Sequence, residues 1–221
     1  MSDTHSAAHP AHLAHHFDTV EQQRESSSLG MWVFLAQEVM FFGGLFLAYT
    51  IYRHEDEATF AAASRELELF WGTVNTVVLL TSSLTMALAV HAAKSSQSRQ
   101  FQLFLIATLI LGSVFIGIKG MEYHHKYVHH LMPLAGLPFE WHGSSAGHAE
   151  LFFNLYFLMT GVHALHMLIG LGILIVLLLK ASRGGLLGDS SAPVHVTGLY
   201  WHFVDVVWVF LFPLLYLIGA R

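Results

Sequence analysis

The sequence predicts an all-α, polytopic membrane protein, built as a bundle of five transmembrane helices. Of its 221 residues, 54% are hydrophobic and only 11% are charged, whereas soluble domains carry about 25% charged residues. Five apolar segments each reach the length of about 20 residues that a helix needs to cross a bilayer. Strand-like alternation over segments of about ten residues is absent, so the pattern does not indicate a membrane β-barrel.

The apolar segments set the expected bounds of the helices. They lie at about 29–52, 70–93, 101–121, 151–179 and 196–219. The fourth segment is long enough that its helix must tilt or protrude. Small residues four apart, at Gly44 and Ala48 and at Ser113 and Gly117, predict that helices approach one another closely there.

The first 28 residues differ from the rest of the chain because they are polar. Five histidines occur among them: His5, His9, His12, His15 and His16. A signal peptide needs a basic start and an apolar stretch, and neither is present. We therefore expect residues 1–28 to form a disordered, histidine-rich tail and residues 29–221 to form the transmembrane domain.

Basic residues between the segments give the expected orientation. The side of the N-terminus holds Arg24, Lys94, Arg99, Lys180 and Arg183, and the opposite side holds Arg53, Arg65, Lys126 and Arg221. Cytoplasmic loops carry the excess of Lys and Arg, so this small bias predicts a cytoplasmic N-terminus and an outward C-terminus. The longest connection, 122–150, then faces outward, and a loop of this length is usually functional or packed on a partner.

Composition also excludes some functions. The chain has no cysteine, which excludes disulfides, thiolate metal sites and cysteine nucleophiles. Its formal net charge of −5 provides no basic surface for nucleic acid, so we expect no nucleic-acid partner. Histidine is unusually abundant, with 17 residues.

Glu38 is the most informative single residue, because it lies inside the first apolar segment. At 1.5 Å per residue it lies about 14 Å from Leu29, close to the middle of a hydrocarbon core about 30 Å thick. An ionisable side chain at this depth costs at least a few kcal/mol and is a functional-site candidate by default. We expect its carboxyl group to be neutral or hydrogen-bonded at pH 7.

Three further pairs of polar residues lie in the apolar segments or at their ends, each with i, i+3 spacing. They are Lys119 with Glu122, His163 with His166, and His202 with Asp205. The first pair can form an ion pair on one helix face, and we expect it to be structural. The other two leave three interpretations open: structural hydrogen bonds, proton handling, or ligation of a metal or haem, which needs additional ligands.

Five stretches of the chain stand out by their sequence. They are GMWVFLAQEVMFFGGLF (30–46), NTVVLLTSS (75–83), FIGIKGMEYHH (115–125), FLMTGVHALHMLIG (157–170) and YWHFVDVVWVFLF (200–212). Together they resemble cytochrome c oxidase subunit III of the haem-copper oxidases, and the last stretch is highly specific. The resemblance runs from about Gly30 to Gly219 and is to the short, five-helix bacterial form, which lacks the first helix pair of the long form.

The resemblance implies a non-catalytic subunit of a proton-pumping oxidase that reduces oxygen to water in aerobic respiration. Its expected place is the bacterial inner membrane beside subunit I, with subunit II, small subunits and a larger respiratory supercomplex as further partners. Partner subunits would hold the haem and copper, while this chain would have no catalytic residue and no metal ligand. It would support proton uptake by subunit I and the stability of that subunit.

Site residues follow from the same resemblance. The two acids of the family match Glu38 and Glu122, and its polar core matches His163, His166, His202 and Asp205. Phospholipid binding is also implied. In the long form, however, lipid lies in a cleft between the rest of the bundle and the first two helices, which this chain lacks, so no lipid-binding residue is carried over.

Two other readings remain open on the sequence. One is a related subunit of a quinol oxidase or of a nitric oxide reductase complex. Glu38 favours a cytochrome c oxidase over a quinol oxidase, because quinol oxidase subunits of the family often lack this acid. The other is a proton-coupled transporter that uses Glu38 as its carrier, but transporters usually break helices near the membrane midplane. The only proline inside the five segments is Pro213.

Overall fold

The computed structural model describes residues 17, 19–133, 139–143, 145–182 and 186–220. These residues form helices and no strand. The elements are α1 (Val20–Glu55), α2 (Glu57–Arg65), α3 (Leu69–Lys94), α4 (Ser98–Val128), α5 (Ala146–Ala181), η1 (Gly188–Ser191), α6 (Ala192–Tyr216) and η2 (Ile218–Ala220). The five long helices are long and apolar enough to cross a membrane. The predicted all-α, five-helix membrane fold is therefore confirmed.

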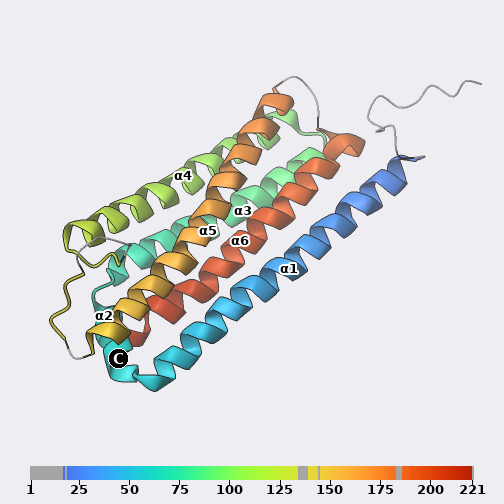
Figure 1. Cartoon of the computed structure of the whole chain (residues 1–221). Coiled ribbons are helices and arrows are strands. Elements are labelled where there is room, and N and C mark those ends of the chain that lie inside the picture. The colour runs from blue at the N-terminus through green and yellow to red at the C-terminus, as the bar shows by residue number, and fades with distance from the viewer. Residues whose placement is uncertain (1–16, 18, 134–138, 144, 183–185, 221) are drawn as a thin grey trace, which may run out of the picture.

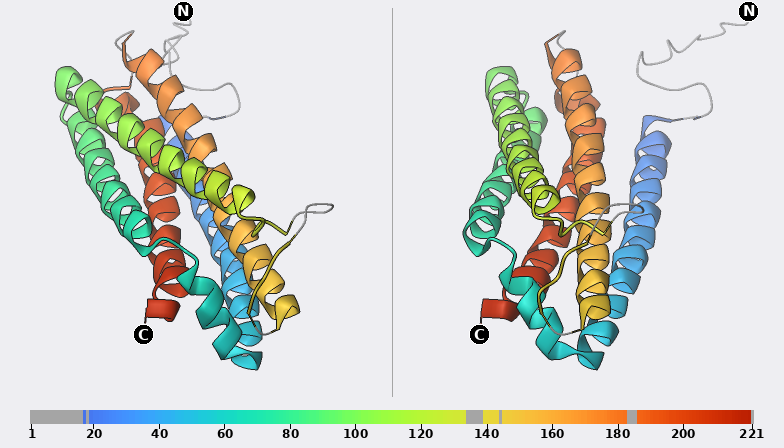
Figure 2. Two further views of the ribbon diagram at one scale, coloured as in Figure 1. Left: turned by 90° about the vertical axis from the view of Figure 1, so that its left-hand side faces the viewer. Right: turned by 60° about the vertical axis from the view of Figure 1, so that its left-hand side comes forward.

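The long helices run antiparallel to their neighbours in the chain, and α1 lies at one edge (Figure 1). Helices α3 and α4 form a hairpin, α6 packs against α3 and α5, and α1 contacts α6 and α5. Only 11% of the most apolar window of α1 is buried within the chain, compared with 50% for α6. Figure 2 shows α1 at the side of the group formed by α3, α4, α5 and α6. A large part of α1 is therefore free to face lipid or another subunit.

The tight core lies around Trp201 of α6, which is fully buried. A Cβ added at Gly112 of α4 would lie 2.8 Å from the Trp201 ring, and one added at Gly170 of α5 would lie 2.9 Å from it. These two glycines leave room for the indole. The close packing predicted at Gly44 and Gly117 is not observed, because nothing lies within 4 Å of a Cβ added at either position.

Helix α1 begins at Val20, inside the stretch predicted to be a disordered tail. The Thr19 hydroxyl accepts a hydrogen bond of 3.1 Å from the Gln22 amide, and Glu21 lies in the first turn. An N-cap of this kind and an acid near the positive end of the helix both stabilise it. Residues 20–28 of the predicted tail are thus helical in the structure. Residues 1–16, with the five tail histidines, lie outside the described residues.

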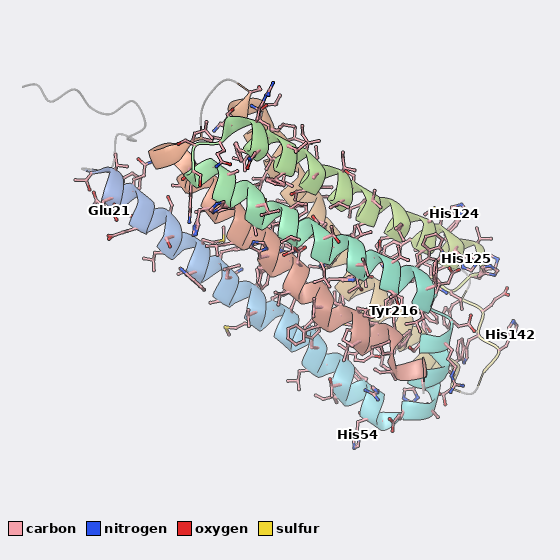
Figure 3. All side chains as sticks on the ribbon, turned by 180° about the vertical axis from the view of Figure 1, so that it is seen from behind. Glu21, His54, His124, His125, His142 and Tyr216 are labelled. Carbon is pink, nitrogen blue, oxygen red and sulfur yellow. The ribbon has the colours of Figure 1, made fainter. Side chains whose placement is uncertain are left out.

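The end of the bundle opposite Glu21 is rich in histidine, including His54, His124, His125 and His142 (Figure 3). Helix α4 continues to Val128 and α5 begins at Ala146, so the connection predicted at 122–150 is shorter than expected. At the same end, α2 forms hydrogen bonds with the end of α6 and with η2. The Ser64 hydroxyl donates to the Leu215 carbonyl at 2.6 Å, and Arg65 Nε donates to the Gly219 carbonyl at 3.0 Å.

Candidate functional site

The carboxyl group of Glu38 meets the imidazole of His166 where α1 crosses α5. Oε2 of Glu38 lies 3.4 Å from Nε2 of His166. Glu38 is buried, with an exposed fraction of 8%, although most of α1 is exposed. The two residues were identified separately in the sequence, and the fold brings them together in the apolar part of the bundle.

The other ring nitrogen of His166 has a partner in the backbone of its own helix. Nδ1 of His166 lies 2.9 Å from the carbonyl oxygen of Val162. A carbonyl oxygen can only accept, so Nδ1 carries a proton. A hydrogen bond between Nε2 and the carboxyl group would use one more proton, either on Glu38 or on the imidazole. In both forms the pair has no net charge, which suits a site in a membrane.

Helix α6 supports this pair from the side. The Tyr200 hydroxyl donates to the backbone carbonyl of His166 at 2.9 Å, and the Tyr200 ring stacks on Phe34 of α1 with centroids 5.9 Å apart. The ring of Phe42, one turn beyond Glu38, lies 5.7 Å from the imidazole. Aromatic side chains and one hydrogen bond thus fix α1, α5 and α6 around the Glu38–His166 pair.

A second polar group lies in the interior where α4, α5 and α6 meet. Nζ of Lys119 donates to Glu122 Oε2 at 2.9 Å, to the Tyr156 hydroxyl at 3.1 Å and to the Tyr216 hydroxyl at 2.8 Å. The two tyrosine hydroxyls donate in turn to Glu122 Oε1, at 2.9 Å from Tyr156 and 2.6 Å from Tyr216. The ion pair expected from spacing is present, but it is fully enclosed and has two additional members.

The ammonium group of Lys119 also has aromatic neighbours. It lies 5.1 Å from the centroid of the Trp208 ring and 5.1 Å from that of Tyr156, within the range of cation–π attraction. The cluster formed by Lys119, Glu122, Tyr156 and Tyr216 is therefore neutral overall and well hydrogen-bonded. Its chemistry is that of a structural junction between three helices.

His163 does not join His166, although both lie on α5 with i, i+3 spacing. Its ring packs between Phe115, with centroids 5.5 Å apart, and Trp208, with centroids 5.3 Å apart. The residue is 1% exposed, and neither ring nitrogen has a hydrogen-bond partner among the described residues. His163 is therefore part of the aromatic core rather than of the Glu38 site.

His202 and Asp205 likewise do not bond to each other. Nδ1 of His202 lies 2.8 Å from the Ser83 hydroxyl of α3. That hydroxyl also lies close to the buried Asp205 carboxyl group, but neither Asp205 oxygen has a hydrogen bond of normal geometry to a described residue. Ser83 thus stands between the two side chains that the sequence pairs.

The described part of the chain gives no support for the interpretation that these residues ligate a metal. No group of three or more His, Asp or Glu side chains there is placed to hold a metal ion. The sequence reasoning missed Tyr156, Tyr216, Tyr200 and Ser83 as partners of the polar groups. An isolated Tyr or Ser in an apolar helix gives no sign of which neighbouring helix it will face.

Comparison with known proteins identifies the family of the chain. A family model described as cytochrome c oxidase subunit III matches residues 7–130 and 134–220. "Cytochrome c oxidase subunit 3" of Alkalihalophilus pseudofirmus is 32% identical over 209 residues, which cover 94% of this chain and 94% of that protein. "Probable quinol oxidase subunit 3" of Staphylococcus saprophyticus is 30% identical over 210 residues, which cover 94% of this chain and 98% of that protein.

These matches extend over nearly the whole chain. The names of the relatives cover oxidases of two kinds, distinguished by their electron donor. The chain therefore belongs to the cytochrome c oxidase subunit III family, as a multi-pass membrane subunit of a haem-copper oxidase complex.

Proposed function

We propose that the chain is a non-catalytic subunit of a proton-pumping cytochrome c oxidase in the bacterial inner membrane. It supports proton uptake by the neighbouring catalytic subunit I, stabilises that subunit and binds phospholipid. Haem and copper are held by partner subunits, and the N-terminus is cytoplasmic. The observation that carries this proposal is the Glu38–His166 pair, with its 3.4 Å contact in the apolar part of the bundle.

The pair supports this role because it can hold or release one proton at a defined place. Moving the proton between Glu38 and His166 leaves the net charge of the site unchanged, whereas releasing it to a neighbouring group leaves a charged carboxylate, so release in the membrane is favoured only when another proton replaces it. A group with these properties can buffer proton delivery to a neighbouring subunit without carrying out redox chemistry. Glu122 is already bonded to Lys119 and two tyrosines, so we assign it a structural role.

Replacing Glu38 with Gln is expected to leave assembly of the oxidase intact, because the amide keeps the size and can still donate to His166. Turnover, protons pumped per electron or lifetime during turnover should change by less than about tenfold, the equivalent of about 1.4 kcal/mol. The measurement is proton pumping and inactivation of the whole complex in proteoliposomes. Glu25→Gln, at an exposed position of α1, is the matched control. Complete loss of oxidase activity in Glu38→Gln would contradict a supporting role.

The outer face of α1 supports a place beside another subunit. Gln37 is exposed in the apolar part of α1, one residue from Glu38. An amide without a hydrogen-bond partner in hydrocarbon costs several kcal/mol, so a partner helix with a polar group is the better neighbour. Gly44, two helical turns further along α1, is also exposed and has nothing within 4 Å of a built Cβ. Small residues with a nearby polar group are typical of contacts between membrane helices.

Gly44→Leu should therefore weaken assembly without unfolding the chain, since a Cβ at this exposed position has nothing within 4 Å of it in its own chain. Gly117→Leu on α4 is the matched control, because that position is equally open. The measurement is the amount of chain that co-purifies with the haem-containing subunits in mild detergent. If the two variants co-purify with the haem-containing subunits in equal amounts, the contact with the partner subunit lies on another face of this chain.

Two alternatives have distinct signatures. The quinol oxidase relatives make quinol a second candidate electron donor, and nitric oxide reductase complexes are a further possibility. Purification of the intact complex, followed by haem spectra and activity with reduced cytochrome c or with quinol, separates them. A proton-coupled transporter would instead move a solute in proteoliposomes that contain this chain alone.

A further inference from the structure

The contact between α3 and α6 contains a buried acid that the Glu38 site does not use. Asp205 is 3% exposed, and neither of its carboxyl oxygens has a hydrogen-bond partner among the described residues. It lies 13 residues after Ala192, where α6 begins, which is about 20 Å at 1.5 Å per residue. Asp205 is therefore deep in the apolar part of the bundle, where a charged carboxylate without partners is strongly disfavoured.

The hydroxyl group of Ser83 connects this acid to a histidine nearer the surface. Nδ1 of His202 lies 2.8 Å from that hydroxyl, and the carboxyl group of Asp205 lies close to the same hydroxyl. Ser83 and His202 are partly exposed, and Leu84, the next residue of α3, is exposed. The three polar side chains thus lead from the core of the bundle to the lateral surface between α3 and α6.

This group is separate from the Glu38 site, although both contact α6. Tyr200 donates to the His166 carbonyl on α5, whereas His202, rotated from Tyr200 by about 200° around the helix axis, contacts α3. The two polar sites therefore face different sides of α6. The other imidazole, carboxyl and ammonium groups in the apolar parts of the helices around α6 belong to the Glu38 site, the Lys119 cluster or the aromatic core, and they are Glu38, Lys119, Glu122, His163 and His166.

A hydroxyl group between an acid and an imidazole can pass on a proton, because it both donates and accepts hydrogen bonds. When the Ser83 hydroxyl donates to Nδ1 of His202, it can only accept from Asp205, which must then carry a proton. In the transfer, the Asp205 proton moves to the Ser83 oxygen while the original Ser83 proton moves to Nδ1. One O–H bond breaks at Asp205, one N–H bond forms at His202, and Ser83 is again a hydroxyl. The products are a carboxylate and an imidazolium, so the net charge of the group stays zero.

We infer that Asp205, Ser83 and His202 form a proton relay, separate from the Glu38–His166 pair, which holds a proton on the buried acid and exchanges it through Nε2 of His202 at the lateral surface. The inference rests on the proposed function, since a subunit that supports proton uptake needs groups that hold protons. Its test measures proton exchange at one carboxyl group rather than turnover or pumping. The relay and the proposed function can therefore fail separately.

The test uses the intact oxidase complex and Fourier-transform infrared spectroscopy. Asp205→Asn should remove one carboxylic-acid C=O band from the wild-type spectrum, because only a protonated carboxyl group gives this band. Ser83→Ala should keep the band but slow its shift after transfer to D₂O by about 100-fold, at the lower end of what a positioned proton-transfer group contributes. Ser83→Thr keeps the hydroxyl and should exchange like the wild type. Ser113→Ala is the matched control, because the Ser113 hydroxyl donates to a backbone carbonyl of its own helix.

Two further measurements keep the test decisive. The haem content of the purified complex shows whether each variant has assembled, and ¹³C labelling of aspartate in the wild type should shift the same band without any substitution. If Asp205→Asn removes no carboxylic-acid band, or labelling shifts none, Asp205 is a carboxylate and the relay is wrong. Equal exchange in Ser83→Ala, Ser113→Ala and the wild type would also overturn the relay, because Ser83 would then not pass on the proton.

Discussion

Replacement of Lys119 with methionine is expected to lower the free energy of unfolding by about 3–5 kcal/mol, the usual cost of removing one member of a buried ion pair. Methionine fills a similar volume but provides no charge and no donor. Glu122 would then keep a buried carboxylate with only the hydroxyls of Tyr156 and Tyr216. The large effect comes from the charge left without its partner rather than from lost packing.

The double variant Lys119→Met/Glu122→Gln separates these two causes. It removes both charges, so it should recover much of the lost stability, because a buried pair replaced as a whole is often close to neutral. Unfolding in increasing denaturing detergent, followed by far-ultraviolet circular dichroism, provides the measurement. Lys180→Met, at an exposed position, is the control. If the double variant is as unstable as Lys119→Met, the packing of Lys119, and not its charge, dominates.

The Lys119 cluster also shows what could be predicted from the sequence. Lys119 and Glu122 lie on the same helix, so their i, i+3 spacing was enough to predict the pair. Tyr156 and Tyr216 come from two other helices, and their participation depends on how α5 and α6 are rotated about their axes. Spacing within one helix contains no information about that rotation. Local pairs could therefore be predicted, and the partners across helices could not.

The same limit applies to the Glu38 site. The depth of Glu38 in an apolar segment made it a functional-site candidate. His166 was a candidate for the same reason, because it also lies in an apolar segment. Their contact could not be predicted, because several combinations of the polar residues were equally compatible with spacing. His163 and His166 share one side of α5, yet that side borders two neighbours, α1 and the aromatic core. His166 contacts Glu38 there, whereas His163 contacts only the rings of Phe115 and Trp208.

Glycine positions show a further difference between pattern and packing. The pairs Gly44–Ala48 and Ser113–Gly117 have the spacing that permits close helix contact, but Gly44 and Gly117 face open space. The tight contacts occur at Gly112 and Gly170, where Trp201 enters. A small residue only permits close approach. The large side chain that uses the space decides which small residue is buried.

Trp201 is the side chain whose removal should have the largest packing effect. Trp201→Ala is expected to cost about 3–5 kcal/mol, as is usual for a buried tryptophan whose cavity is only partly refilled. The indole is fully buried, and its Nε1 donates to the Ser82 hydroxyl at 3.1 Å. Trp32→Ala on α1 is the matched control, because Trp32 is 59% exposed. Thermal unfolding of both variants in detergent gives the comparison.

Trp201→Ala should also affect the Glu38 site, because the preceding residue, Tyr200, donates to the His166 carbonyl. Loss of the indole between α4 and α5 allows α6 to shift, and the Tyr200–His166 bond then loosens. Hydrogen exchange of the amides around His166 should become faster in Trp201→Ala and stay unchanged in Trp32→Ala. Unchanged exchange in both variants would show that the Glu38–His166 pair is held by α1 and α5 alone.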